Sequence, residues 1–182
     1  GWVLTDWQIE IFEYPKHGDK ILAQTWSEGL SSPLGANRNF LLYKNGEVCA
    51  RGTSRWIIID FESGRPTKIE PSYLEKYGVE DKTVFDEKKL TRIPTPETWT
   101  AEVTLPVRRA DIDFNDHVHN LTYLDYAMEL LPAGHYKNMR IAYKTGLKDG
   151  SSAKVSYAQV DGAHIVNICD GEGSLACQLM FS

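Results

Sequence analysis

Two dipeptides, Asn45-Gly46 and Asp161-Gly162, each separate two apolar runs that have strand character. Asn-Gly and Asp-Gly are the preferred residues of two-residue hairpin turns, because both central positions of such turns need a positive φ. The sequence therefore predicts an antiparallel hairpin in each half of the chain. Strands that are joined by such short turns pair with their neighbours along the chain, so we expect antiparallel rather than parallel sheet.

Other stretches show the strand pattern, in which apolar and polar side chains alternate with a period of two. Trp7, Ile9 and Ile11 alternate with Gln8 and Glu10, so one face of this strand is expected to be buried. Strands are predicted in the first half at 7–11, 21–26, 38–43 and 47–60, and in the second half at 102–107, 139–147, 153–160, 163–170 and 174–181.

A single stretch, residues 120–131, predicts a long helix. Asn120 is a suitable N-cap, and Pro132 ends the helix. The apolar residues of one stripe are Leu121, Leu124, Met128 and Leu131. Because apolar residues surround most of its circumference, we expect the helix to be wrapped by a sheet. The expected fold class is therefore α+β.

A charged stretch with several prolines lies between the two groups of strands and includes Glu87, Lys88 and Lys89. It is long for a loop inside a compact domain, so it predicts a linker, with one short helix at about 72–77. The expected organisation is a first unit at 1–70, a linker at 71–98 and a second unit at 99–182.

The two units share an order of elements, which indicates two repeats of one plan. In each unit a tyrosine, Tyr14 or Tyr143, precedes a turn that contains aspartate and glycine. The second unit opens with a strand, a turn and a helix for which the first unit has no counterpart. On this interpretation the first repeat is incomplete, and roughly 40 to 60 residues of repeat-like sequence are expected before Gly1.

Charge and cysteine content exclude several classes of function. The net charge of -5 is spread over the chain without a basic face, which disfavours nucleic-acid binding. No stretch approaches the ~18 to 20 apolar residues of a membrane helix. The three cysteines (Cys49, Cys169 and Cys177) have no CxxC spacing, so neither a disulfide framework nor a zinc site is expected. A reducing compartment, and hence a cytoplasmic location, is the simpler expectation.

The densest polar cluster runs from Asp111 to Asn120, between a predicted strand and the predicted helix. It holds three carboxylates, two imidazoles and two amides. One interpretation is structural, because Asp and Asn are common in turns and caps. A second is an acid/base site beside a helix N-terminus, where free N–H groups can stabilise an oxyanion. Such a site would need a channel along the helix that an acyl chain could fill.

A third interpretation of the same cluster is a metal site. Asp111, Asp113 and Asn115 match the opening of a calcium-binding loop, but Asp116 and Thr122 stand where that loop needs a glycine and a bidentate acid. The His117-x-His119 pair could hold a transition metal if a further ligand were supplied. The sequence offers no clear third ligand, so no metal or other cofactor is expected.

The motif Asp113-Phe-Asn115-Asp-His117-Val-His119-Asn120, followed by Leu-Thr-Tyr123, resembles the signature D-x-N-x-H-V-N-N-x-x-Y of the acyl-acyl-carrier-protein thioesterases. Landmarks of the first unit, including Trp2-Val-Leu, Tyr14-Pro15, Arg38-x-Phe40 and Arg65-Pro66, occur in the order of that family. The resemblance covers nearly the whole chain. It implies a double hot-dog fold, with two repeats in which a curved antiparallel sheet wraps a helix.

The resemblance also implies an activity: hydrolysis of the thioester between a fatty acyl group and acyl carrier protein. A homodimer is a separate expectation. The implied catalytic residues are Asp113, Asn115 and His117. The residues expected to contact the substrate or its carrier are Asn120, Tyr123, Arg108 and Arg109. For the two arginines, an ion pair at the surface is an equally good interpretation.

Two positions depart from the family pattern. His119 stands at an asparagine of the signature, and Gly146 stands where plant members carry a catalytic glutamate. Either Asp116 or Asp149 replaces that acid, or Asp113 and His117 act alone, or the activity is weak. The alternative functions are therefore an acyl-binding protein with little catalysis, a dehydratase of the same fold, and an acyl-coenzyme A thioesterase.

Overall fold

The structure is a computed structural model that describes residues 1–86, 90 and 92–182. The chain forms two compact units, Gly1–Thr91 and Arg92–Ser182. Within each unit the strands pair antiparallel, so the predicted antiparallel architecture with few helices is confirmed. The linker residues Glu87, Lys88 and Lys89, which were predicted to be part of a charged connection, lie outside the described residues.

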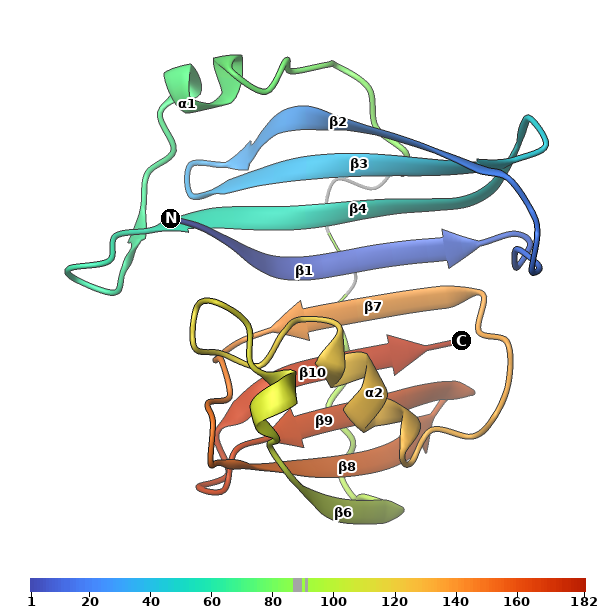
Figure 1. Ribbon diagram of the computed structural model, residues 1–182, viewed down its shortest axis with the longest axis vertical. Helices are drawn as coiled ribbons and strands as arrows, with labels where there is room; N and C mark the ends of the chain where they lie inside the picture. Colours follow the sequence, from blue (N-terminus) through green and yellow to red (C-terminus); the bar gives the residue numbers. More distant parts are fainter. Residues whose placement is uncertain (87–89, 91) are drawn as a thin grey trace. The chain divides into compact units, whose positions relative to one another are not determined.

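The sheet of the first unit has the strand order β2-β3-β4-β1, and a short β5 pairs with β4 (Figure 1). The strands are β1 (Trp2–Ile11), β2 (Ile21–Ser32), β3 (Gly35–Lys44), β4 (Glu47–Ile59) and β5 (Pro66–Thr67). Asn45 and Gly46, with φ of 54° and 87°, form the predicted turn between β3 and β4. One face of this sheet carries Trp7 and Phe40, whose ring centroids are 4.9 Å apart.

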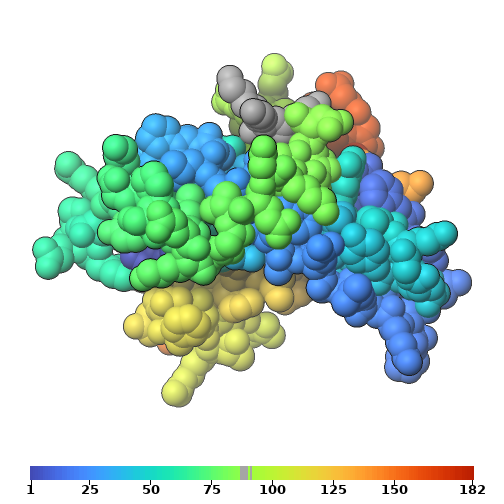
Figure 2. Space-filling view, turned by 90° about the horizontal axis from the view of Figure 1, so that it is seen from above, coloured from blue at the N-terminus to red at the C-terminus, as the bar shows by residue number. Residues whose placement is uncertain are grey.

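The chain that follows the first sheet packs back onto it. The short helix α1 (Pro71–Glu75), predicted at 72–77, buries Leu74 against Ala36 together with Ile69. Beyond α1, the carbonyl of Lys82 accepts a hydrogen bond from Trp26 Nε1 at 2.7 Å. Figure 2 shows the green segment, which contains α1 and the chain after it, lying against the blue segment that contains β2. Part of the predicted linker is therefore held on the first unit by specific contacts.

The second unit has a five-stranded sheet in the order β7-β10-β9-β8-β6, and α2 crosses one face of it (Figure 1). Its elements are β6 (Ala101–Pro106), the 3-10 turn η1 (Arg109–Asp111), α2 (Thr122–Met128), β7 (Asn138–Tyr143), β8 (Ser152–Val160), β9 (Ala163–Cys169) and β10 (Leu175–Phe181). Asp161 and Gly162 form the second predicted hairpin turn, with φ of 49° and 83°. Buried residues beneath α2 include Val155, Val166, Ile168 and Leu179.

The helix α2 differs from its prediction in length and in the side it buries. It begins at Thr122 rather than Asn120 and ends at Met128. Leu121, at the N-cap position, makes no side-chain cap hydrogen bond. The sheet covers Tyr123, Tyr126 and Ala127, whereas Leu121 and Met128 of the predicted stripe are 63% and 68% exposed. A helix on a sheet buries one side only, so the expected burial around most of its circumference was wrong.

Two further findings bear on the sequence predictions. In the described part of the chain, no helix has the length and apolar character needed to cross a membrane. The cysteines are free thiols, and Cys49 and Cys177 are buried while Cys169 is partly exposed.

Candidate active site

The predicted catalytic residues lie together in a tight loop between η1 and α2. A bridge between Ile112 and Val118 closes the loop, and the Asp113 N–H donates to the His117 carbonyl at 2.8 Å. Inside it, Asp113 Oδ1 accepts the Asn115 N–H at 2.8 Å. Asp116 takes a φ of 61°, which aspartate tolerates better than most residues. The close spacing of these residues in sequence therefore places them together in one tight loop.

The imidazole of His117 is oriented by the loop that carries it. Its Nδ1 lies 2.7 Å from the backbone carbonyl oxygen of Asn115. A carbonyl oxygen can only accept a hydrogen bond, so Nδ1 carries the proton and Nε2 holds the lone pair. Among the described residues, no group forms a hydrogen bond with Nε2. The half-buried His117 can therefore accept a proton at Nε2.

The loop is fastened to the chain that follows β7. The Leu147 carbonyl accepts the Val118 N–H at 2.8 Å, and the Leu147 N–H donates to the Tyr123 hydroxyl at 3.0 Å. The Tyr143 hydroxyl donates to the Asn120 carbonyl at 3.1 Å. These bonds hold Gly146 directly against the His117 ring. Burial raises the pKa of Tyr123 to about 12, so this phenol stays protonated and serves as a structural tie.

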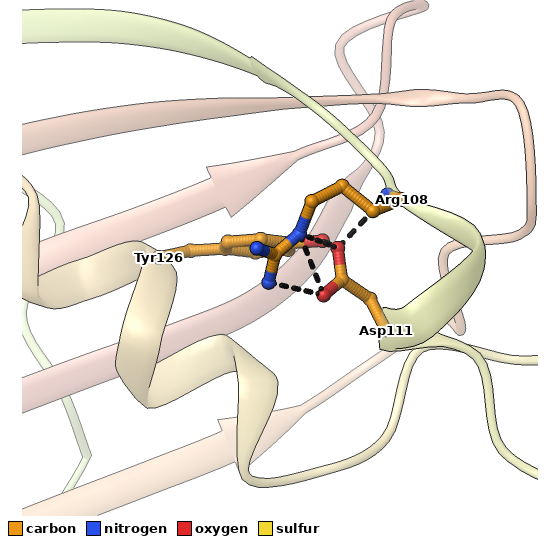
Figure 3. A network of polar contacts seen from close by, with 3 residues as sticks. All are labelled: Arg108, Asp111 and Tyr126. Carbon is orange, nitrogen blue, oxygen red and sulfur yellow. Dashed lines mark hydrogen bonds and ion pairs between the residues drawn. The ribbon is translucent and has the colours of Figure 1, made fainter.

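A second set of polar contacts fixes the start of the loop. The buried Asp111 carboxylate accepts hydrogen bonds from two guanidinium N–H groups of Arg108, the shorter at 2.6 Å (Figure 3). It also accepts a hydrogen bond from the Tyr126 hydroxyl at 2.8 Å. Hydrogen bonds from Arg108 lower the pKa of Asp111 to about 2. The Asp111 carbonyl also accepts the His119 N–H at 2.8 Å. Asp111 thus joins the end of β6, the loop and α2.

The residues predicted to contact the substrate have different surroundings. Arg108 is paired with Asp111, and Tyr123 is buried. Arg109 and Asn120 are exposed. Exposure leaves Arg109 and Asn120 accessible to a partner. Arg108 is also largely exposed, but its guanidinium is paired with Asp111, and Tyr123 is buried inside the unit.

Two of the N–H groups at the N-terminus of α2 have partners within the loop. The N–H of Leu121 donates to His119 Nδ1 at 3.2 Å, and the N–H of Thr122 donates to the His119 carbonyl at 2.9 Å. These two donors are therefore used within the loop. The Asn115 side-chain amide, which is exposed at the loop tip, is the better donor to an oxyanion.

Neither candidate for a replacement acid reaches His117. Asp116 and Asp149 are both exposed, and within the described ranges no hydrogen bond or ion pair joins either carboxylate to the imidazole. Asp111, which the sequence placed in the polar cluster and matched to the opening of a calcium loop, anchors the start of the loop. Its i, i+3 spacing from Arg108 was the available signal. Across residues 1–86, 90 and 92–182, no three acidic, histidine or cysteine side chains are grouped to hold a metal ion.

Comparison with known proteins decides the family. The model of the acyl-ACP thioesterase N-terminal domain matches residues 1–77, and that of the acyl-ACP thioesterase C-terminal domain matches residues 96–174. The chain belongs to the acyl-ACP thioesterase family. The resemblance seen in the sequence is thereby confirmed for both units.

Curated relatives in this thioesterase family include two plant proteins. The oleoyl-acyl carrier protein thioesterase 1 of Arabidopsis thaliana, named as chloroplastic, is 32% identical over 143 residues, which cover 72% of this chain and 39% of the relative. The palmitoyl-acyl carrier protein thioesterase of the same plant, also named as chloroplastic, is 29% identical over 189 residues, which cover 97% of this chain and 45% of the relative. The chain thus spans less than half the length of these relatives.

Solved structures of family members share the fold. The 12:0-ACP thioesterase from Umbellularia californica superposes with a TM-score of 0.89 at 22% identity, covering all of this chain and 74% of that one. An acyl-ACP thioesterase from Bacteroides thetaiotaomicron gives a TM-score of 0.85 at 23% identity, covering 99% of this chain and 75% of that one. The arrangement of strands and helices described above is therefore that of acyl-ACP thioesterases.

Proposed function

We propose that this protein hydrolyses the thioester of fatty acyl-ACP and releases the free fatty acid. The observation that carries the proposal is the contact of His117 Nδ1 with the Asn115 carbonyl, which leaves the Nε2 lone pair available as a base. Family membership supplies the chemical class of substrate. Together they favour direct attack by water on the thioester carbonyl.

The step needs only groups of the loop and one water molecule. His117 Nε2 takes a proton from the water, whose oxygen forms a bond to the thioester carbon. The Asn115 amide donates to the carbonyl oxygen as negative charge develops there. The carbon–sulfur bond then breaks, and the proton on His117 passes to the departing sulfur. The products are a carboxylic acid and the free thiol of the carrier.

Asp113 supports the proposal as an orienting group. Its carboxylate holds the Asn115 N–H, which keeps the amide side chain and the carbonyl that binds His117 in one fixed turn. A fixed arrangement lowers the entropic cost of reaching the transition state. The three catalytic residues that the sequence implied therefore receive distinct roles, with His117 as base, Asn115 as oxyanion donor and Asp113 as positioning group.

The proposal also covers the residues that would contact the carrier and the organisation of the chain. Arg109, an exposed cation just before the loop, is our candidate contact for the phosphopantetheine phosphate or the carrier surface, and exposed Asn120 at the end of the motif is a second candidate contact. We propose that residues 1–70 and 99–182 are two hot-dog repeats joined by 71–98. A homodimer and a cytoplasmic location stay predictions.

The proposal is tested by thiol release from acyl-ACP with a His117→Ala variant. We expect kcat to fall on the order of 10²- to 10⁴-fold, the usual worth of a general base. The matched control is His17→Ala, which removes an exposed histidine from a turn of the first unit and should leave kcat unchanged.

The fold of each variant is checked by its thermal unfolding. Normal turnover in a folded His117→Ala protein would show that this imidazole is not the base. No thiol release from the unaltered chain, combined with acyl-ligand stabilisation against heat, would instead select the acyl-binding alternative.

A further inference from the structure

Gly146 occupies a place where no side chain fits beside His117. A Cβ built on Gly146 would lie 2.9 Å from His117 Cγ and 3.2 Å from His117 Nε2, and closer still to Cδ2. Contacts below 3.0 Å between such atoms require one of the groups to move. The imidazole therefore rests on the bare backbone of Gly146.

The backbone of Gly146 has little freedom to give way. Before it, the Lys144 N–H donates to the Ala176 carbonyl at 2.8 Å, and the Thr145 hydroxyl donates to the Leu175 carbonyl at 3.2 Å. After it, Leu147 is held through its N–H by Tyr123 and through its carbonyl by Val118. A new side chain at this position would consequently displace the ring rather than the backbone.

Displacement of the ring has a chemical consequence. The proton-accepting form of His117 depends on the 2.7 Å contact between Nδ1 and the Asn115 carbonyl. A ring pushed away from Gly146 loses that contact, and with it the preference for a lone pair on Nε2. The absence of a side chain at position 146 therefore allows the ring to keep the contact that leaves the lone pair on Nε2.

We propose that Gly146 is a positioning residue, whose lack of a side chain seats the His117 imidazole so that Nε2 can accept a proton. The kinetic part of this inference rests on the proposed hydrolysis, whereas the seating of the ring stands by itself. On this account position 146 is not a site from which a catalytic acid has been lost. A carboxylate introduced there would collide with the base instead of assisting it.

The direct test compares Gly146→Ala and Gly146→Glu with Gly134→Ala, whose Cβ would meet only the Tyr136 ring at 3.8 Å, an ordinary contact. In both Gly146 variants we expect the nitrogen-15 signals of His117 to lose the pattern of a ring protonated at Nδ1. We expect kcat to fall about 100-fold with KM changed little, since a misplacement near 1 Å costs about that much. The control should match the unaltered protein.

A thermodynamic cycle keeps the inference testable where activity is not informative. Gly146→Ala should lower the melting temperature by a few degrees when His117 is present and by much less in a His117→Ala background, because the clash partner is then gone. Equal destabilisation in both backgrounds would overturn the inference. So would unchanged His117 signals in Gly146→Ala, or a higher kcat in Gly146→Glu.

The two proposals fail in different ways. If the unaltered chain releases no thiol but Gly146→Ala still shifts the His117 signals and the cycle shows coupling, the proposed hydrolysis is wrong and the seating of the ring stands. If the chain releases thiol and the cycle shows no coupling, the hydrolysis stands and the role of Gly146 is wrong.

Discussion

At the residue scale, Asp111 fixes the start of the loop that carries Asp113, Asn115 and His117. Its carboxylate is almost fully buried, and it is satisfied by Arg108 and Tyr126 (Figure 3). A buried carboxylate without partners would be costly, so these hydrogen bonds are what permit an acid at this position. The low pKa of Asp111 means that the folded state favours its ionised form.

This pKa predicts a pH dependence of stability. The pKa of Asp111 is about 2 in the folded protein, below the value of about 3.9 for an unfolded aspartate. The stabilising contribution is therefore complete above about pH 4 and is lost as the pH falls towards 2. Because the guanidinium of Arg108 is largely exposed, we expect Asp111→Asn to cost only about 1–2 kcal/mol at pH 7.

Urea unfolding of the unaltered chain and of Asp111→Asn at pH 7 and pH 3 measures this contribution. The difference in free energy of unfolding should be smaller at pH 3. Asp149→Asn, which changes an exposed aspartate, serves as control and should show no difference at either pH. A gap for Asp111→Asn that stayed constant between the two pH values would contradict the role given to the ionised carboxylate.

At the scale of elements, α2 packs on the sheet and also makes hydrogen bonds to two other segments of the unit. Its Tyr123 and Tyr126 reach in two directions, one to Leu147 after β7 and the other to Asp111 in η1. The ring of Tyr123 also packs edge-on against Tyr143 of β7, with centroids 5.7 Å apart. A helix of one and a half to two turns thereby ties together the segments that flank His117.

Removing the Tyr123 hydroxyl should loosen this tie. Tyr123→Phe leaves the Leu147 N–H buried without its acceptor, which we expect to cost about 1–2 kcal/mol. Hydrogen exchange at the Leu147 amide should become faster in the variant. Tyr73→Phe, which alters an exposed tyrosine of α1, is the matched control. Unchanged exchange at Leu147 would show that the hydroxyl is not the acceptor that protects it.

The strands of both units were largely predictable from the sequence, because period-two alternation and the two hairpin dipeptides are local signals. The grouping of Asp113, Asn115 and His117 was also predictable, since all three belong to one short loop. The seating of His117 on Gly146 and the Tyr123–Leu147 bond were not predictable. They join residues 24 to 29 positions apart, and no local pattern records such pairs.

The ends of α2 were misjudged for a related reason. Asn120 is a good N-cap by residue type, but its carbonyl is used by Tyr143 and the helix begins two residues later. Leu121 and Met128 made the helix look apolar around most of its circumference in the sequence, but the sheet buries neither of them. At the N-terminus of α2, tertiary contacts therefore overrode the capping preference of Asn120. Along the helix, they buried fewer apolar residues than its composition suggested.

At the scale of the whole molecule, the chain forms two compact units, and the strands within each pair antiparallel. The chemistry that we propose draws on residues of the second unit alone, from Asp113 to Gly146. The first unit offers a cavity of about 200 Å³ lined by Trp2, Trp56, Leu74 and Tyr77 among others. Family models match both units, so the chain has both domains of the acyl-ACP thioesterase family.

The measurement that tests the central claim most directly is hydrolysis in water enriched in oxygen-18. The same fatty acyl group is supplied on acyl carrier protein and on coenzyme A, and both the free thiol and the fatty acid are quantified. The account predicts equal amounts of thiol and acid, one heavy oxygen in each released acid, and faster release from acyl carrier protein. An absence of thiol and labelled acid with folded protein and either substrate would contradict it.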